Sequence, residues 1–179
     1  MKQGILSKIK KKLALELGWV PKDFAVTADG LIAYYDWGQK NNAELEWFTE
    51  FVRHRMPEQR QRLNFYGVYG KGKFVRRRAD GVKVFFSLEN VDKKYMKWNF
   101  LFGDYALPYV DLAMGFADLQ NDKYLRFPLW LQYIFSPTAD RNEIEATVKQ
   151  INEVHYPKTK ECALVAGHAS AFKIITIFI

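Results

Sequence analysis

A carboxylate and an amide follow directly on an apolar run near the middle of the chain. The segment VKVFFSLENV (residues 82–91) begins as a strand and turns polar at Glu89 and Asn90. One interpretation is that Glu89 is solvated and that Asn90 begins a turn. The other is that the strand carries Glu89 to the rim of a ligand crevice, because ligands of open α/β sheets bind outside the carboxyl ends of the strands. A carboxylate held there can act as a general base.

A second candidate site lies in NDKYLRFPLW (residues 121–130). Side chains alternate between the two faces of a strand, so Tyr124 and Arg126 fall on one face. Pro128 limits ladder pairing, which favours an edge strand. Tyrosine can stack on a sugar ring, and the arginine fork reaches hydroxyls or phosphates. An amphipathic edge strand without a ligand explains the same pattern equally well.

The glycine-rich segment GVYGKGKF (residues 67–74) nearly matches the motif of a phosphate-binding loop. Phe74 stands where that loop needs Ser or Thr for a magnesium ion, and the next residues head for a turn. We therefore predict a glycine-rich turn after a strand. The run Arg76–Arg78 could bind nucleic acid, but no aromatic-basic stripe accompanies it, so we expect a solvated turn and no nucleic-acid partner.

Nothing in the sequence indicates a metal site. The three histidines show no ligand spacing, no acidic cluster is present, and Cys162 is the single cysteine. We assign no metal-ligating residues and expect no cofactor, whereas metal dependence stays open; the absence of a disulfide framework favours a cytoplasmic location. The length of 179 residues fits one domain with a real core, and no apolar run reaches the length of a membrane span.

Residues 1–20 are predicted to form a basic amphipathic helix. Ile5, Ile9 and Leu13 recur at helical spacing with lysines between them, and the net charge of the whole chain is +7. Such a helix can lie on an anionic lipid surface, which would make the protein peripheral on the inner membrane. The alternative is a helix packed on its own domain with a solvated basic face.

The elements that position these residues alternate between strands and helices. Strand patterns occur at residues 31–37, 62–70, 82–87, 110–117 and 161–167. A helix is predicted at 41–56, with Asn42 as its cap and with Leu45, Phe48 and Val52 on one face; a second helix is predicted at 140–155, with a capping box of Asp140 and Glu143. This alternation predicts an α/β fold with a mostly parallel sheet.

Several motifs in order resemble the α-1,3-fucosyltransferases of glycosyltransferase family 10. The resemblance covers about residues 30–166. It rests on SLEN (87–90), similar to a Gly-Glu-Asn-type turn, on VDLAMGF (110–116), similar to an Asp-Tyr-Ala-x-Gly-Phe segment, and on DKYLRFPL (122–129), similar to Asp-Arg-Tyr-Leu-Arg-x-Pro-Leu. The segment IAYYDWG (32–38) also resembles the first strand of that family.

The resemblance implies a Rossmann-like N-terminal domain of a two-domain GT-B-type glycosyltransferase. Such enzymes transfer L-fucose from GDP-fucose to a hydroxyl of an N-acetylglucosamine or glucose unit with inversion. The turn glutamate carries over to Glu89 as general base. We expect an oligosaccharide acceptor to contact Trp37, Tyr124 and Arg126, and Asn90 either to orient Glu89 or to bind the acceptor.

Two departures from the family pattern accompany the resemblance. Leu88 stands where the family has glycine, and the Phe-Glu-Asn and Thr-Glu-Lys segments of its donor-binding domain do not occur. We therefore expect an acceptor-side domain at 21–167, an aberrant apolar tail at 168–179 and no donor-binding domain, so that the chain is truncated and inactive alone. The alternative is a non-catalytic glycan-binding module derived from such an enzyme; a basic protein that binds membranes or polyanions is a weaker third.

Overall fold

The computed structural model describes residues 21, 23–38, 42–70, 72–87, 91 and 102–153. The chain divides into two compact units, 1–139 and 140–179, and each is considered by itself. The predicted helix at 1–20, the predicted strand at 161–167 and the tail at 168–179 lie outside the described residues. These assignments, and the domain boundaries built on them, stay predictions.

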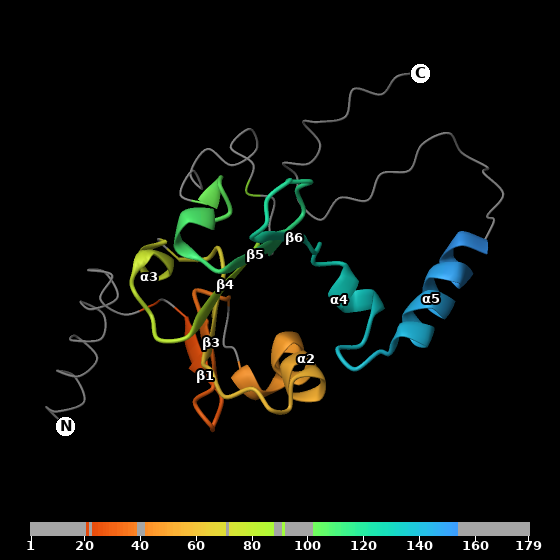
Figure 1. Cartoon of the computed structure of the whole chain (residues 1–179), viewed down its shortest axis with the longest axis horizontal. Helices are drawn as coiled ribbons and strands as arrows, with labels where there is room; N and C mark the ends of the chain where they lie inside the picture. Colours follow the sequence, from red (N-terminus) through yellow and green to blue (C-terminus); the bar gives the residue numbers. More distant parts are fainter. Residues whose placement is uncertain are drawn as a thin grey trace, which may run out of the picture. The chain divides into compact units, whose positions relative to one another are not determined.

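The first unit is built on one six-stranded sheet (Figure 1). Its strands are β1 (Phe24–Val26), β2 (Ile32–Tyr35), β3 (Leu63–Tyr66), β4 (Val82–Phe86), β5 (Leu112–Gly115) and β6 (Tyr124–Arg126). β1 pairs antiparallel with β2, and every other neighbouring pair is parallel. The predicted α/β fold with a mostly parallel sheet is therefore confirmed, whereas the antiparallel β1 was not predicted.

The six strands stand side by side in chain order. Because β2 to β6 are parallel, their carboxyl ends meet at one edge, which we call the carboxyl edge. The described residues that follow β2, β4 and β6 in the sequence include Trp37, Ser87 and Phe127. The register thus places these three residues at the same edge.

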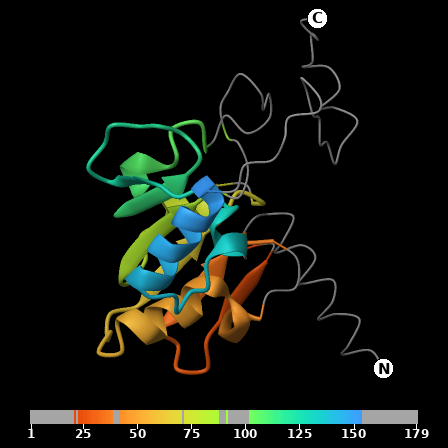
Figure 2. The same ribbon diagram turned by 90° about the vertical axis from the view of Figure 1, so that its right-hand side faces the viewer.

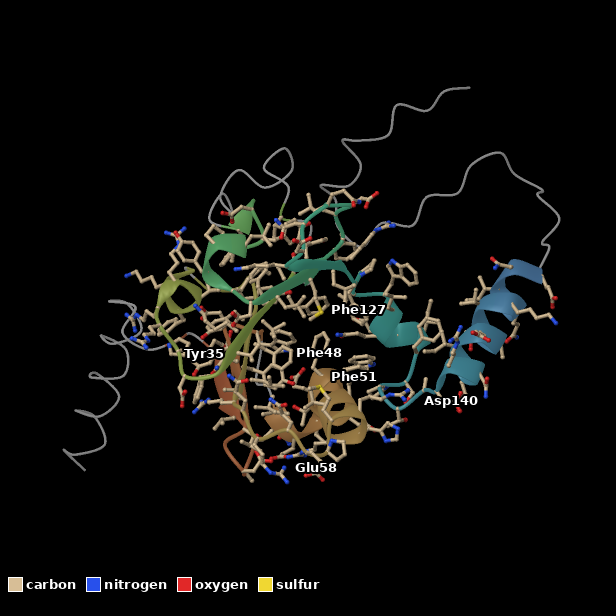
Figure 3. All side chains as sticks on the ribbon, viewed as in Figure 1. Tyr35, Phe48, Phe51, Glu58, Phe127 and Asp140 are labelled. Carbon is tan, nitrogen blue, oxygen red and sulfur yellow. The ribbon has the colours of Figure 1, made fainter. Side chains whose placement is uncertain are left out.

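Each face of the sheet carries its own hydrophobic core, because side chains alternate along every strand. On the first face, α2 (Trp47–Arg55) packs against the strands (Figure 1, Figure 2). The buried members of this first core are Ile32, Tyr34, Trp37, Ala43, Phe48, Val52, Leu63, Phe65, Val84, Phe86 and Met114. Phe48 meets Phe127 with ring centroids 5.9 Å apart, which ties the residue after β6 to α2 (Figure 3).

The second face is covered by α3 (Lys73–Arg76) and by the segment that contains η3 (Leu107–Tyr109). Buried members of this second core are Tyr66, Val68, Val75, Phe85, Val91, Phe102, Tyr105, Ala106, Val110 and Ala113. In β4, Phe85 faces the second core and Phe86 faces the first, and both are fully buried. β4 is therefore held firmly on both faces up to its last residue.

The helix predicted at 41–56 is interrupted. Asn42 caps the short 3-10 turn η1 (Ala43–Leu45), accepting a hydrogen bond from the Glu44 backbone N–H at 3.1 Å. Glu46 is then extended, and α2 begins at the next residue. The break turns Leu45 outward, where it is 81% exposed. The expectation that Leu45 shares the buried face of Phe48 and Val52 is wrong for this reason.

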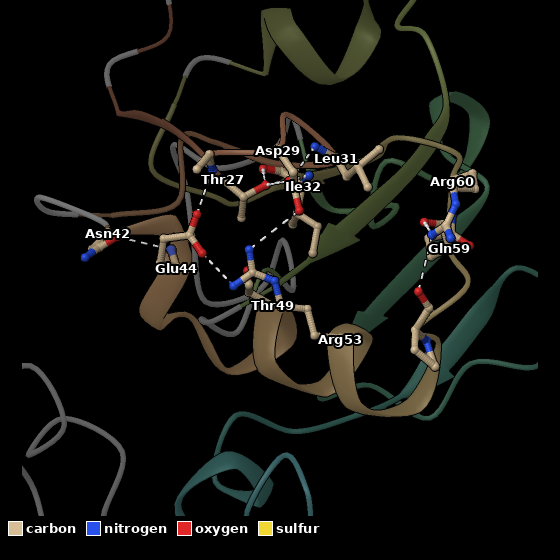
Figure 4. Close-up of polar contacts among 12 residues, drawn as sticks. Thr27, Asp29, Leu31, Ile32, Asn42, Glu44, Thr49, Arg53, Gln59 and Arg60 are labelled. Carbon is tan, nitrogen blue, oxygen red and sulfur yellow. Dashed lines mark hydrogen bonds and ion pairs between the residues drawn. The ribbon is translucent and has the colours of Figure 1, made fainter.

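The turn between β1 and β2 is fixed by polar contacts to η1 and α2 (Figure 4). The Thr27 hydroxyl donates to the Asp29 carboxylate at 2.6 Å, and the Leu31 backbone N–H donates to it at 2.9 Å. These hydrogen bonds, with Arg53 nearby, lower the pKa of Asp29. Arg53, which lies in α2, also forms an ion pair with Glu44 in η1. Together these contacts attach the turn between β1 and β2 to α2.

The glycine-rich segment after β3 ends at Gly72, which has φ 67°, and the helix α3 that begins there contains four residues. A phosphate-binding loop would need a longer helix at this point, so the predicted glycine-rich turn is confirmed. Further along, the chain forms α4 (Leu131–Ile134) after β6. No helix in the described ranges is long and apolar enough to cross a membrane.

The second unit begins with α5 (Arg141–Glu153). Its predicted capping box is confirmed: the Glu143 backbone N–H donates to the Asp140 carboxylate at 2.9 Å, and the Asp140 backbone N–H donates to the Glu143 carboxylate at 2.7 Å. Ion pairs at i, i+4 spacing join Arg141 to Glu145 and Lys149 to Glu153 on the helix surface.

Candidate functional site

β4 precedes Glu89, the predicted general base, in the sequence. After Phe86 the chain reaches Ser87, which is fully buried and donates its backbone N–H to the Met114 carbonyl at 2.9 Å. This bond extends the pairing of β4 with β5 one residue past the strand. Glu89 and Asn90 lie outside the described residues, so their predicted roles stay predictions.

The structure brings Tyr124 and Arg126 to one face of an edge strand, as predicted. Tyr124 pairs with Ala113, and Arg126 pairs with Gly115, so both side chains lie on the side of the second core. The Phe127 backbone N–H donates to the Gly115 carbonyl at 2.9 Å, which completes the ladder just before Pro128. β6 is the last strand of the described sheet, and its outer edge has no partner strand there.

Tyr124 is half-buried. Its ring meets the ring of Tyr105 with centroids 4.9 Å apart and an angle of 74° between planes. The Tyr124 hydroxyl oxygen is buried and makes no hydrogen bond to any residue that the structure describes. Burial raises the pKa of this hydroxyl well above its usual value, so it stays protonated and remains a donor at neutral pH.

Arg126 is exposed, in contrast to its neighbour Tyr124. Its Nε donates to the Phe116 carbonyl at 3.3 Å, and no ion pair joins it to a carboxylate within the described ranges. The Nη atoms of the guanidinium group therefore remain able to bind ligand oxygens in a fork. Of the candidate site residues that the structure describes, Arg126 is the one that a ligand can reach most directly.

Gly115 in β5 allows the Tyr105 ring to pack closely against the strand. A Cβ atom at Gly115 would lie 2.5 Å from Cε1 of Tyr105 and 3.3 Å from the Cβ of Ser87. Real Cβ atoms do not approach other atoms this closely, so only glycine allows the Tyr105 ring to lie against β5. This glycine within a strand pattern is a signal of close approach that the sequence contains.

Trp37 lies in the first core and is 6% exposed. Its ring contacts the rings of Phe48 and Phe86, with centroids 5.9 and 5.8 Å apart, and its indole N–H donates to the Glu46 carboxylate at 2.9 Å. Burial raises the pKa of Glu46, against the opposing effect of that hydrogen bond. Because the Trp37 ring is almost completely buried, it offers a ligand little surface. The acceptor-binding role of Trp37 stays a prediction.

Asp36 is a polar residue at the carboxyl edge that the reasoning from sequence missed. It is 4% exposed and has φ 51°, a conformation that non-glycine residues seldom adopt. Its carboxylate lies against Gly70, where an added Cβ would collide with it, and its carbonyl accepts the Tyr69 backbone N–H at 3.1 Å. The signal was available: an acidic residue ends the strand pattern, and a glycine-rich turn comes after the next strand.

The described part of the site combines the exposed guanidinium of Arg126 with the half-buried ring of Tyr124 on the edge strand β6, two strands away from β4. No cluster of three or more His, Cys, Asp or Glu side chains that could hold a metal ion occurs in the part of the chain that the structure describes. Chemically, the described residues of the edge can bind hydroxyl or anionic groups of a ligand.

Comparison with known proteins identifies the family of the chain. No curated protein and no solved structure matches the chain. A family model described as the alpha-(1,3)-fucosyltransferase FucT N-terminal domain matches residues 32–133, which is more than half of the chain and runs from the start of β2 into α4. This chain therefore belongs to the family of alpha-(1,3)-fucosyltransferase N-terminal domains.

Proposed function

We propose that the chain forms the acceptor side of a two-domain GT-B-type α-1,3-fucosyltransferase. The enzyme would transfer L-fucose from GDP-fucose to a hydroxyl of an N-acetylglucosamine or glucose unit in a glycan, with inversion. The observation that carries this proposal is the family match over residues 32–133. The matched segment contains the whole parallel part of the sheet, including the edge that carries Tyr124 and Arg126.

In the proposed reaction Glu89 acts as general base. The acceptor oxygen attacks the anomeric carbon of fucose, its proton passes to the Glu89 carboxylate, and the bond from that carbon to the GDP oxygen breaks. A single displacement of this kind inverts the anomeric centre. An ordinary glutamate has a pKa of roughly 4.3, so the base is ionised at neutral pH. The burial of Phe85 and Phe86 supports this role, because a strand fixed on both faces also positions the residues just beyond its end.

The acceptor glycan would lie along the carboxyl edge. Arg126 would bind its hydroxyl groups, and Tyr124 would present the exposed part of its ring, since its hydroxyl is buried. Asn90 would orient Glu89 or bind the acceptor. Trp37 would act mainly as support, because its indole group lies in the first core.

The donor would be held by a second domain that faces this edge. GDP departs with the charge of two phosphates, and that charge must be stabilised by groups that a donor-side domain supplies. We therefore expect that the 179 residues bind acceptor but do not transfer fucose by themselves. The proposed reaction uses no cofactor beyond GDP-fucose. The protein would act in the cytoplasm, with its basic N-terminal segment on the anionic inner membrane surface.

The decisive experiment restores a complete enzyme. The chain would be joined to the donor-side domain of another fucosyltransferase, and transfer of labelled fucose to N-acetyllactosamine would be measured. Glu89→Gln should lower turnover by about a hundredfold or more, because a proton acceptor is lost while the shape is kept. Glu58→Gln, at an exposed position between α2 and β3, serves as the matched control because it makes the same chemical change at a carboxylate to which no role is assigned. Near-normal turnover of the Glu89 variant would contradict the assignment.

A second candidate is a non-catalytic glycan-binding module derived from such an enzyme. The observation that favours it is that the family match concerns an N-terminal domain alone. Saturable acceptor binding by the chain, combined with no transfer in the joined enzyme under any condition, would place this candidate first.

A further inference from the structure

A small cavity lies on the second-core face of the sheet, away from β5 and β6. Its volume is about 190 Å³. It is open to solvent on one side and lies between residues of β2 and β3 and the segment that leads from α3 to β4; its lining residues are Tyr35, Arg62, Asn64, Tyr66, Phe74, Arg77, Arg78, Ala79 and Asp80. We call it the arginine–tyrosine pocket. Neither the family match nor the proposed transfer reaction assigns it a role.

The lining of this pocket carries an excess of positive charge. Three arginines face a single acid, Asp80. Among the residues that the structure describes, Arg62 and Arg78 form no ion pair with any carboxylate. Arg77 lies with its guanidinium carbon 4.8 Å from the centroid of the Phe74 ring, which holds it at the wall of the pocket. An anion entering this space would therefore meet the guanidinium groups of Arg62 and Arg78 with their charge available.

Arg62 is held in place by a buried amide. Its Nε donates to the Asn64 side-chain oxygen at 3.2 Å, and Asn64, which is 1% exposed, donates to the Asp80 carbonyl at 2.7 Å. One Nη atom reaches the Tyr35 hydroxyl at 3.5 Å, while the other makes no hydrogen bond to any described residue. The fork is thus oriented by the protein and keeps donor capacity for a ligand.

Tyr66 adds a hydroxyl donor to the same space. It is 3% exposed, lines the pocket and stacks on Tyr35 with ring centroids 4.9 Å apart and an angle of 15°. Its hydroxyl makes no hydrogen bond to any described residue, which leaves it available to a ligand. Burial raises its pKa, with a smaller contribution from Tyr35, so the group stays protonated and can donate.

We propose that the arginine–tyrosine pocket binds a phosphomonoester group. Three residues that line the pocket carry donors, the guanidinium groups of Arg62 and Arg78 and the hydroxyl of Tyr66, and together these donors match the several oxygens of a tetrahedral dianion. A volume of about 190 Å³ is smaller than the sites that hold drug-sized ligands and suits a phosphate with the atoms next to it. The phosphate can belong to a phosphorylated sugar or be inorganic phosphate; the chemistry that the pocket recognises is the same.

The test is calorimetric titration of the full chain with glucose 6-phosphate, inorganic phosphate and glucose. Glucose 6-phosphate should bind saturably, more weakly as salt is raised, and glucose should not bind. Arg78→Gln and Tyr66→Phe should each weaken binding, the first by about tenfold because a charge-assisted hydrogen bond is lost. Arg76→Gln is the matched control: it removes the same charge from the same basic run at a residue that does not line the pocket.

The possible outcomes distinguish a phosphorylated sugar from free phosphate as the ligand, and they include results that would overturn the proposal. Tighter binding of glucose 6-phosphate than of inorganic phosphate identifies a phosphorylated sugar as the ligand, and equal binding identifies free phosphate. Absence of saturable binding for both phosphates overturns the proposal. Equal losses in Arg76→Gln and Arg78→Gln overturn it too, because the affinity would then depend on net charge and not on the pocket.

Discussion

The Tyr105 ring meets the Tyr124 ring edge to face, with centroids 4.9 Å apart. This contact joins the segment covering the second core to the edge strand β6. Tyr105 is 4% exposed, and both it and Ala106 have φ 54°, in the left-handed region that residues other than glycine seldom occupy. The tight turn thus brings Tyr105 over Gly115 and encloses the Tyr124 hydroxyl at the candidate acceptor site.

The enclosed hydroxyl of Tyr124 has a measurable consequence for stability. Tyr124→Phe should leave the free energy of unfolding unchanged or raise it by about 1 kcal/mol, because it removes a buried donor that no described residue satisfies. Tyr34→Phe is the matched control, since the Tyr34 hydroxyl is fully buried and shares a 2.8 Å hydrogen bond with Thr49. That control should lose about 1–2 kcal/mol. Equal losses in urea denaturation of the two variants would show that Tyr124 has a partner.

The close approach at Gly115 should make this position sensitive to a single methyl group. Gly115→Ala is expected to destabilise the protein by about 1–3 kcal/mol, because its Cβ would lie 2.5 Å from Tyr105 and the ring must move. In a Tyr105→Leu background the same substitution should cost clearly less. Thermal unfolding of the unmodified protein, the two single variants and the double variant completes a double-mutant cycle. An identical cost in both backgrounds would mean that Tyr105 is not the obstacle.

Glu46 should impose a pH dependence on stability through its contact with Trp37. Burial raises the pKa of the folded-state carboxyl above its unfolded value, so the folded protein binds more protons than the unfolded chain in this range. Stability at this site is therefore full below the unfolded pKa and falls as the pH rises through the folded pKa. Glu46→Gln keeps an acceptor for the Trp37 indole N–H and should remove this decrease.

The measurement for Glu46 is the unfolding midpoint in urea at a series of pH values from about 4 to 7. The difference between Glu46→Gln and the unmodified protein should shift in favour of the variant as the pH rises. Glu50→Gln, at an exposed position one turn further along the chain in α2, controls for the general effect of losing a carboxylate. A difference that is independent of pH would show that Glu46 titrates alike in the folded and unfolded states.

Much of the sheet could be predicted from local patterns. The strands β2 to β5 were expected from continuous apolar runs that end in polar or glycine residues, and β6 from the alternation around Tyr124. β1 was missed because Phe24–Val26 is a three-residue strand with two exposed side chains, which leaves no pattern. The break before α2 was missed because Glu46 fits a helical first turn as well as an extended cap.

The site was predictable only where one strand positions its residues. The shared face of Tyr124 and Arg126 results from alternation alone. The contact of Tyr105 with Gly115 and the enclosure of Asp36 depend on turns in which residues other than glycine have positive φ. The nearby glycines indicate a close approach, but the sequence does not show which side chain fills the space. The burial of Trp37 depends on α2, which is brought to it by tertiary packing. The arginine–tyrosine pocket depends in the same way on how residues 74–80 fold back over β2 and β3.

The central claim is that the carboxyl edge of the sheet binds a glycan acceptor, and titration of the full chain with N-acetyllactosamine tests it most directly. The unmodified chain should bind saturably. Arg126→Gln should weaken binding by about tenfold, because an exposed guanidinium that contacts the acceptor is lost, whereas Arg141→Gln on α5 should bind as the unmodified chain does. Absence of saturable binding, or equal affinity of the unmodified chain and Arg126→Gln, would contradict the claim.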